Sequence, residues 1–174
     1  MDYINEALRT ESVDGAVTRL HTVEPSISHM LKVAVECETT IDNIKKYVYY
    51  GKETPAISPF ITMHPYNLYA TEENIRLLHA GLGLLTEAAE FLIPVLNSIA
   101  TGEPVDKVNL KEELGDAQWY QAIACDVLNT DFATIQSVNI AKLKARYPEK
   151  FSADKAIHRD LIAEREILED DSSM

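Results

Sequence analysis

Two pairs of acidic residues, each spaced three residues apart in an apolar segment, constrain this chain more than any other feature. The first pair is Glu87 and Glu90, and the second is Glu113 and Asp116. Residues three apart lie on one face of a helix, so two such helices packed together would gather four carboxylates in a small volume. Because like charges that close repel each other, the pattern predicts a hard divalent cation, Mg²⁺ or Mn²⁺, bound by carboxylate oxygens.

The alternative interpretation of these residues is a solvated helix surface, since the chain contains 28 acidic residues. Their neighbours favour the metal site. Glu87 shares a helical stripe with Leu84 and Phe91, and Glu113 shares one with Tyr120. A buried charge without a partner is costly. We therefore expect an ion to neutralise the carboxylates.

Composition limits the classes of protein that the chain can belong to. Its 174 residues suffice for one domain with a core, and its net charge of −12 argues against binding a nucleic-acid duplex through a basic face. The apolar stretch from Leu77 to Ala100 is interrupted by the first acidic pair and by Pro94, and no signal peptide is recognisable, so we expect a cytoplasmic protein outside the membrane. Cys37 and Cys125 are expected to be buried thiols.

Apolar periodicity predicts an all-α fold, an antiparallel bundle of about five helices. The expected helices cover residues 26–50, 72–100, 109–128, 132–147 and 153–169. Thr71 is expected to cap the second helix, and Asn109 with Glu112 to form a capping box for the third. Pro94 cannot donate to the Glu90 carbonyl, so a kink is expected after the first acidic pair.

These helices suggest three parts of the chain. Residues 1–70 would form an N-terminal arm, a helix and a proline-rich loop. Residues 71–170 would form the helical core that carries both acidic pairs, and residues 171–174 a disordered tail. The loop is long enough for a functional role, although its prolines equally suit a packed structural loop.

The strings around the acidic pairs resemble a known family. They read LHAGLGLLTEAAE at 78–90, NLKEELGDAQWY at 109–120 and NIAK at 139–142. They are similar to the phage-like branch of the MazG-like all-α nucleoside triphosphate pyrophosphohydrolases. That superfamily includes the dimeric dUTPases and is marked by E-x-x-E, a spacer and E-x-x-D. The similarity covers about residues 72–150 and implies the same bundle fold.

The resemblance implies an enzyme that hydrolyses a nucleoside triphosphate to the monophosphate and diphosphate. By motif position, Glu87, Glu90, Glu113 and Asp116 would bind Mg²⁺ or Mn²⁺, with two or more ions per site. Members of this type hydrolyse aberrant nucleotides or dUTP, or in some phage relatives reshape purine dNTP pools, and the phage-like resemblance favours a purine dNTP, dGTP or dATP, as substrate. The family also implies a homodimer or tetramer, in the host cytoplasm if the chain is phage-encoded.

Roles for individual residues follow from the same comparison. Glu87 or Glu90 would accept the proton of the attacking water, and neither is preferred. Asn139 and Lys142 share a helical face and by family position would hold the sugar or phosphates of the substrate. For the whole chain, the alternative is a non-catalytic helical interaction protein, or a decayed relative with a structural metal site.

Overall fold

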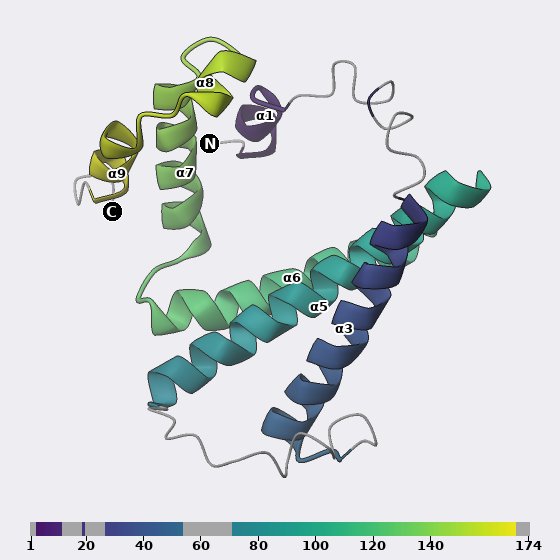
Figure 1. Ribbon diagram of the computed structural model, residues 1–174. Helices are drawn as coiled ribbons and strands as arrows, with labels where there is room; N and C mark the ends of the chain where they lie inside the picture. The colour runs from purple at the N-terminus through teal and green to yellow at the C-terminus, as the bar shows by residue number, and fades with distance from the viewer. Residues whose placement is uncertain (1–2, 12–18, 20–26, 54–70, 170–174) are drawn as a thin grey trace. The chain divides into compact units, whose positions relative to one another are not determined.

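The computed structural model describes residues 3–11, 19, 27–53 and 71–169. Within these ranges it contains seven α-helices and no strand, which confirms the all-α class (Figure 1). The helices are α1 (Tyr3–Leu8), α3 (Ile27–Tyr50), α5 (Glu72–Thr101), α6 (Lys107–Val127), α7 (Phe132–Arg146), α8 (Ala153–Ile157) and α9 (Leu161–Glu169).

The chain divides into two compact units. One combines residues 1–20 with 129–174, and the other comprises residues 21–128. In the second unit, α5 packs against both α3 and α6. Because α3 packs on α5, both helices belong to the unit of residues 21–128. The predicted start of the core, residue 71, lies between these two helices and so falls inside that unit. Residues 54–70 of the predicted loop and the predicted tail lie outside the described residues.

Side-chain caps fix the ends of the long helices. The Thr71 hydroxyl accepts a hydrogen bond from the Asn74 amide, as predicted, and α5 continues through Pro94 to a left-handed Gly102. The predicted capping box of α6 is wrong. Asp106 caps this helix three residues earlier, and its carboxylate accepts from the amides of Val108 and Asn109. An aspartate in extended backbone conformation can do this wherever the following amides are free.

In the unit that contains α7, one buried carboxylate pairs with two arginines. Glu164 on α9 accepts hydrogen bonds from Arg146 on α7 and from Arg159. These two guanidinium groups lower the pKa of Glu164 to about 2. The last predicted helix, 153–169, is two helices, because the chain leaves helical geometry between Ile157 and Leu161. At the other end of the sequence, the Arg9 guanidinium donates to the Tyr147 carbonyl at 2.8 Å.

Helices α5 and α6 approach each other closely at Gly83. A Cβ atom at this position would lie 2.1 Å from the Tyr120 ring, well inside van der Waals contact. Glycine therefore allows the buried Tyr120 side chain to lie against the backbone of α5. This contact brings the segment of α5 that begins at Thr86 next to α6.

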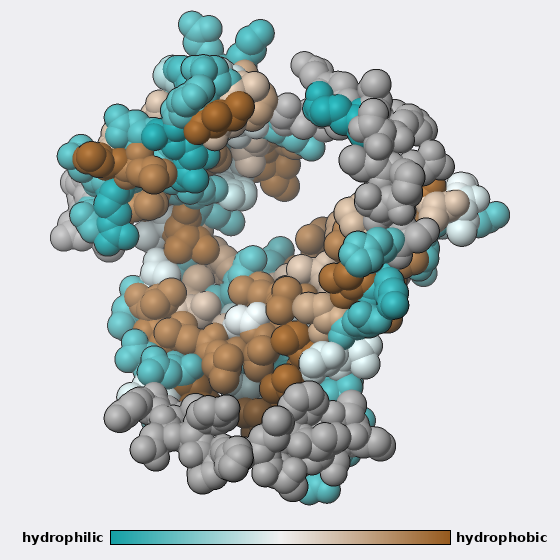
Figure 2. Space-filling view, in the orientation of Figure 1, coloured by the Kyte–Doolittle hydropathy of each residue, from teal (hydrophilic) through white to brown (hydrophobic). Residues whose placement is uncertain are grey.

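One face of α5 presents an apolar stripe to the surface. Its members recur every seven residues and are each 44–47% exposed: Leu78, Leu85, Leu92 and Ile99. Figure 2 shows apolar residues gathered over the unit of residues 21–128, to which α5 belongs. By length and composition alone α5 could cross a membrane, but core helices meet the same criterion. Cys125 is buried as predicted, whereas the prediction for Cys37 is wrong: this thiol is exposed, because the apolar groove that it lines between α3 and α5 is open to solvent.

Candidate metal centre

Three of the four predicted carboxylates meet between α5 and α6. Glu87 and Glu90 come from α5 and Glu113 from α6, and one carboxylate oxygen of each lies within 4.8 Å of the others. Glu87 and Glu113 are buried and Glu90 is half-buried. Asp116 follows Glu113 by one helical turn, but it is exposed and outside this group.

The electrostatics of the group indicate a deficit of positive charge. Burial raises the pKa of Glu90 to about 7, and the carboxylates of Glu87, Glu113 and Glu38 add to this effect. Burial and Glu87 also raise the pKa of Glu113. Carboxyl groups with such raised pKa values are stabilised when a proton or a metal ion binds to them.

A pocket of about 460 Å³ lies beside these carboxylates, between α3, α5 and α6. Its lining consists of Glu38, Asp42 and Lys46 from α3, Glu90, Ile93 and Pro94 from α5, and Asn109 and Glu113 from α6. The Asn109 amide donates to Glu113 Oε1 at 2.9 Å, which orients this carboxylate. Helix α3 therefore adds two carboxylates to the site that sequence reasoning missed.

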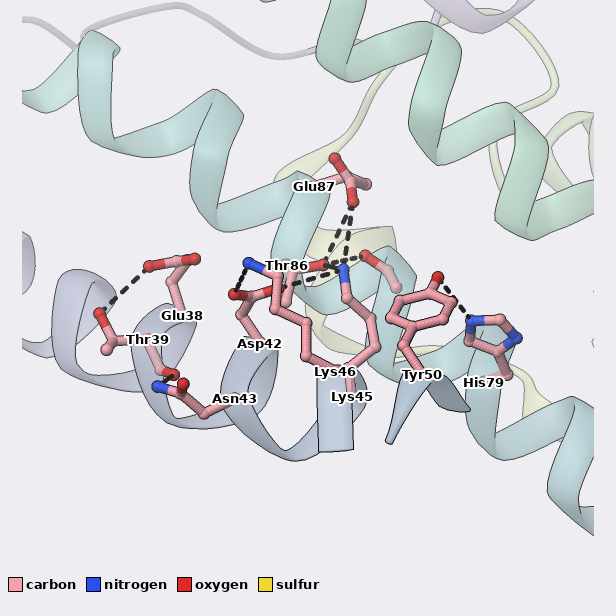
Figure 3. A network of polar contacts seen from close by, with 11 residues as sticks. Glu38, Thr39, Asp42, Asn43, Lys45, Lys46, Tyr50, His79, Thr86 and Glu87 are labelled. Carbon is pink, nitrogen blue, oxygen red and sulfur yellow. Dashed lines mark hydrogen bonds and ion pairs between the residues drawn. The ribbon is translucent and has the colours of Figure 1, made fainter. Parts of the chain in front are cut away.

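A buried lysine of α3 was also missed. Lys45 is 5% exposed, and its ammonium donates to the Thr86 hydroxyl at 2.8 Å (Figure 3). It lies 3.6 Å from Glu87 Oε1 and 3.7 Å from Asp42 Oδ1. Burial lowers the pKa of Lys45, but the Tyr120 hydroxyl and the two carboxylates raise it above the ordinary value. A signal existed in the sequence, since Lys45 follows Ile41 by four residues on the apolar stripe of α3.

Aromatic side chains continue the packing beyond Lys45. The Tyr120 ring lies 5.2 Å from the Lys45 ammonium. His79 stacks on Tyr49, with ring centroids 3.9 Å apart, and also contacts Tyr120 and the half-exposed Trp119. Burial lowers the pKa of His79. Through Tyr120 this aromatic cluster contacts Lys45.

The two predicted substrate-binding residues belong to the other compact unit. Asn139 and Lys142 are half-buried on α7. The Asn139 amide donates to the Tyr3 hydroxyl at 3.0 Å. The neighbouring Lys144 forms a surface ion pair with Glu6 at 3.1 Å. The predicted contact of Asn139 and Lys142 with a substrate stays a prediction.

No protein-family model, curated protein or solved structure matches the chain. The likeness to MazG-like proteins therefore rests on the two acidic motifs and their surrounding residues.

Proposed function

We propose that the protein is a metal-dependent nucleoside triphosphate pyrophosphohydrolase with a MazG-like bundle. The supporting observation is that carboxylates from two motifs, at least 23 positions apart in sequence (113 − 90), gather within 4.8 Å. The raised pKa of Glu90 indicates a demand for positive charge at this point. Hard divalent cations meet that demand with oxygen ligands.

The residues present fit Mg²⁺ or Mn²⁺. Glu87, Glu90 and Glu113 would hold the metal, and Asp116 would join them by its motif position, with two or more ions per site. Such ions neutralise polyphosphate charge and stabilise the leaving group. In the proposed reaction, water adds to the α-phosphorus as the α–β bridging bond breaks and diphosphate leaves.

Glu90 is the better proton acceptor of the two predicted ones. Glu87 Oε1 already lies near the Lys45 ammonium and the Thr86 hydroxyl. In the metal-free chain, burial first and then the neighbouring carboxylates raise the pKa of Glu90. We propose that the water proton transfers to a carboxylate oxygen of Glu90, because Glu87 Oε1 already has Lys45 and Thr86 as neighbours.

Further features of the proposal concern substrate and assembly. Asn139 and Lys142 would bind the sugar or phosphates of a purine dNTP, dGTP or dATP. We propose a cytoplasmic homodimer or tetramer, and the apolar stripe of α5 supports association because it recurs with a heptad spacing. A net charge of −12 disfavours duplex nucleic acid as a partner.

The decisive experiment is a screen of all common dNTPs and NTPs with Mg²⁺ and with Mn²⁺. We expect at least one to yield the monophosphate and diphosphate. Glu113→Gln should abolish this turnover, whereas Glu112→Gln, at the adjacent exposed position, should preserve it. Release of orthophosphate and a nucleoside diphosphate would show that a different bond is cleaved.

A second candidate function is a helical interaction protein with a structural metal. The exposed stripe of α5 favours it, since such surfaces mark contact sites. Calorimetric titration with Mn²⁺ in the absence of nucleotide separates the two. Metal binding without turnover of any nucleotide would support the interaction protein.

A further inference from the structure

The Lys45 side chain is held from three helices. It originates on α3, donates to Thr86 on α5, and lies over the Tyr120 ring of α6. An ammonium this deeply buried is costly unless hydrogen bonds and opposite charges surround it. Each of these contacts limits its movement, so the position of its charge is well defined.

Lys45 and its hydrogen-bond partner Thr86 both approach one oxygen of Glu87, while the ammonium also lies 3.7 Å from Asp42 Oδ1. The ammonium lies 3.6 Å from Glu87 Oε1, and the Thr86 hydroxyl lies 3.2 Å from the same atom. Thr86 is fully buried, and its hydroxyl is also 2.9 Å from the Gly83 carbonyl. The hydroxyl is thus anchored to the backbone of α5. Oε1 has two fixed neighbours on one side, which orients the whole carboxylate.

We propose that Lys45 is a positioning residue and a built-in cation of the site. Through Glu87 Oε1 it orients the carboxylate so that Oε2 is the oxygen offered to a metal ion. Its charge also offsets one carboxylate of the group. The expected effect of Lys45 on turnover rests on the proposed function. Its expected effect on metal binding does not, because metal binding can be measured without nucleotide.

The two roles of Lys45 predict opposite effects of removing its charge. In Lys45→Met the side chain keeps its length and apolar packing, but Glu87 loses the cation beside Oε1 and keeps only its contact with the Thr86 hydroxyl. Even with the dielectric constant of bulk water, repulsion between charges of +1 and +2 at roughly 6 Å corresponds to about a tenfold change in affinity, and at a buried site it is stronger. Mn²⁺ should therefore bind at least about tenfold more tightly to this variant. Misplacement of a reacting group commonly costs up to about 100-fold in rate, so kcat should fall roughly 10- to 100-fold.

The test combines Mn²⁺ calorimetry of the full chain with steady-state kinetics. Lys32→Met is the matched control, because Lys32 is on the same helix and its side chain is 72% exposed. It should change neither the Mn²⁺ dissociation constant nor kcat. Lys45→Arg retains the charge and should keep the wild-type Mn²⁺ affinity, with partial recovery of kcat. The midpoint of thermal unfolding should rise more on addition of Mn²⁺ in Lys45→Met than in wild type.

Several outcomes would overturn the proposal. Weaker or unchanged Mn²⁺ binding in Lys45→Met would show that Lys45 only holds the helices together, and unchanged kcat would show that it positions nothing. If wild type turns over no nucleotide, the proposed function fails, while tighter Mn²⁺ binding would still support the built-in cation.

If Lys45→Met does not fold, Thr86→Val replaces it. This variant keeps all charges, so it should lose turnover at unchanged Mn²⁺ affinity, and full turnover would refute the role of the anchor.

Discussion

Replacing Glu90 by glutamine should stabilise the metal-free protein, and only above about pH 5. The pKa of Glu90 is about 7 in the folded chain against 4.5 for the free side chain. Below 4.5 the carboxyl is protonated in both states and contributes nothing. As the pH rises towards 7, the unfolded chain ionises first, so wild type loses stability that Glu90→Gln retains. At about 1.4 kcal/mol per pKa unit the ceiling is about 3.5 kcal/mol.

Because Glu90 is only half-buried, solvent screening reduces that ceiling to an expected gain of about 1–2 kcal/mol at pH 8. For a chain of this size the midpoint of thermal unfolding should rise by roughly 2–8 °C. The assay is thermal unfolding in a chelator at pH 4.5, 6, 7 and 8. Glu166→Gln, at an exposed position on α9, controls for the loss of a negative charge. A gain of equal size at every pH, or a less stable variant at pH 8, would refute the electrostatic reasoning.

Two further predictions concern helix packing and substrate binding. Gly83→Ala should destabilise the fold by about 1–3 kcal/mol in denaturant unfolding, because its Cβ would overlap the Tyr120 ring; Gly81→Ala, which meets nothing within 4 Å, should instead stabilise it by about 0.5–1 kcal/mol. Lys142→Ala should lower kcat/KM roughly ten- to a hundredfold, mainly by raising KM, if a charge-assisted bond to phosphate worth about 1.5–3 kcal/mol is lost. Lys144→Ala should be nearly silent, and equal losses in both lysine variants would place the phosphate elsewhere.

The sequence predicts the helical class, because that depends on apolar spacing within single helices. It also predicts that Glu87, Glu90 and Glu113 meet, because carboxylates on the apolar stripes of two helices face each other when the helices pack, but it does not predict that Asp116 lies outside the group. It does not decide between neighbouring residues that can each cap a helix. Asn109 is a reasonable candidate, but Asp106 is the residue that caps α6. The contribution of α3 escapes prediction for a different reason. Lys45 and Thr86 are 41 residues apart, and no local pattern links them. Only the packing of α3 on α5 brings the lysine to Glu87.

The division of the chain into units has a consequence for its synthesis. The unit that holds the carboxylates is continuous, whereas the other unit combines the first 20 residues with residues 129–174. Arg9 and its acceptor Tyr147 are 138 residues apart. At roughly 5–20 residues per second, Arg9 is added to the chain about 7–28 s before Tyr147. Helices α3, α5 and α6 are all synthesised within this interval. The carboxylate unit can therefore fold before α1 packs against α7.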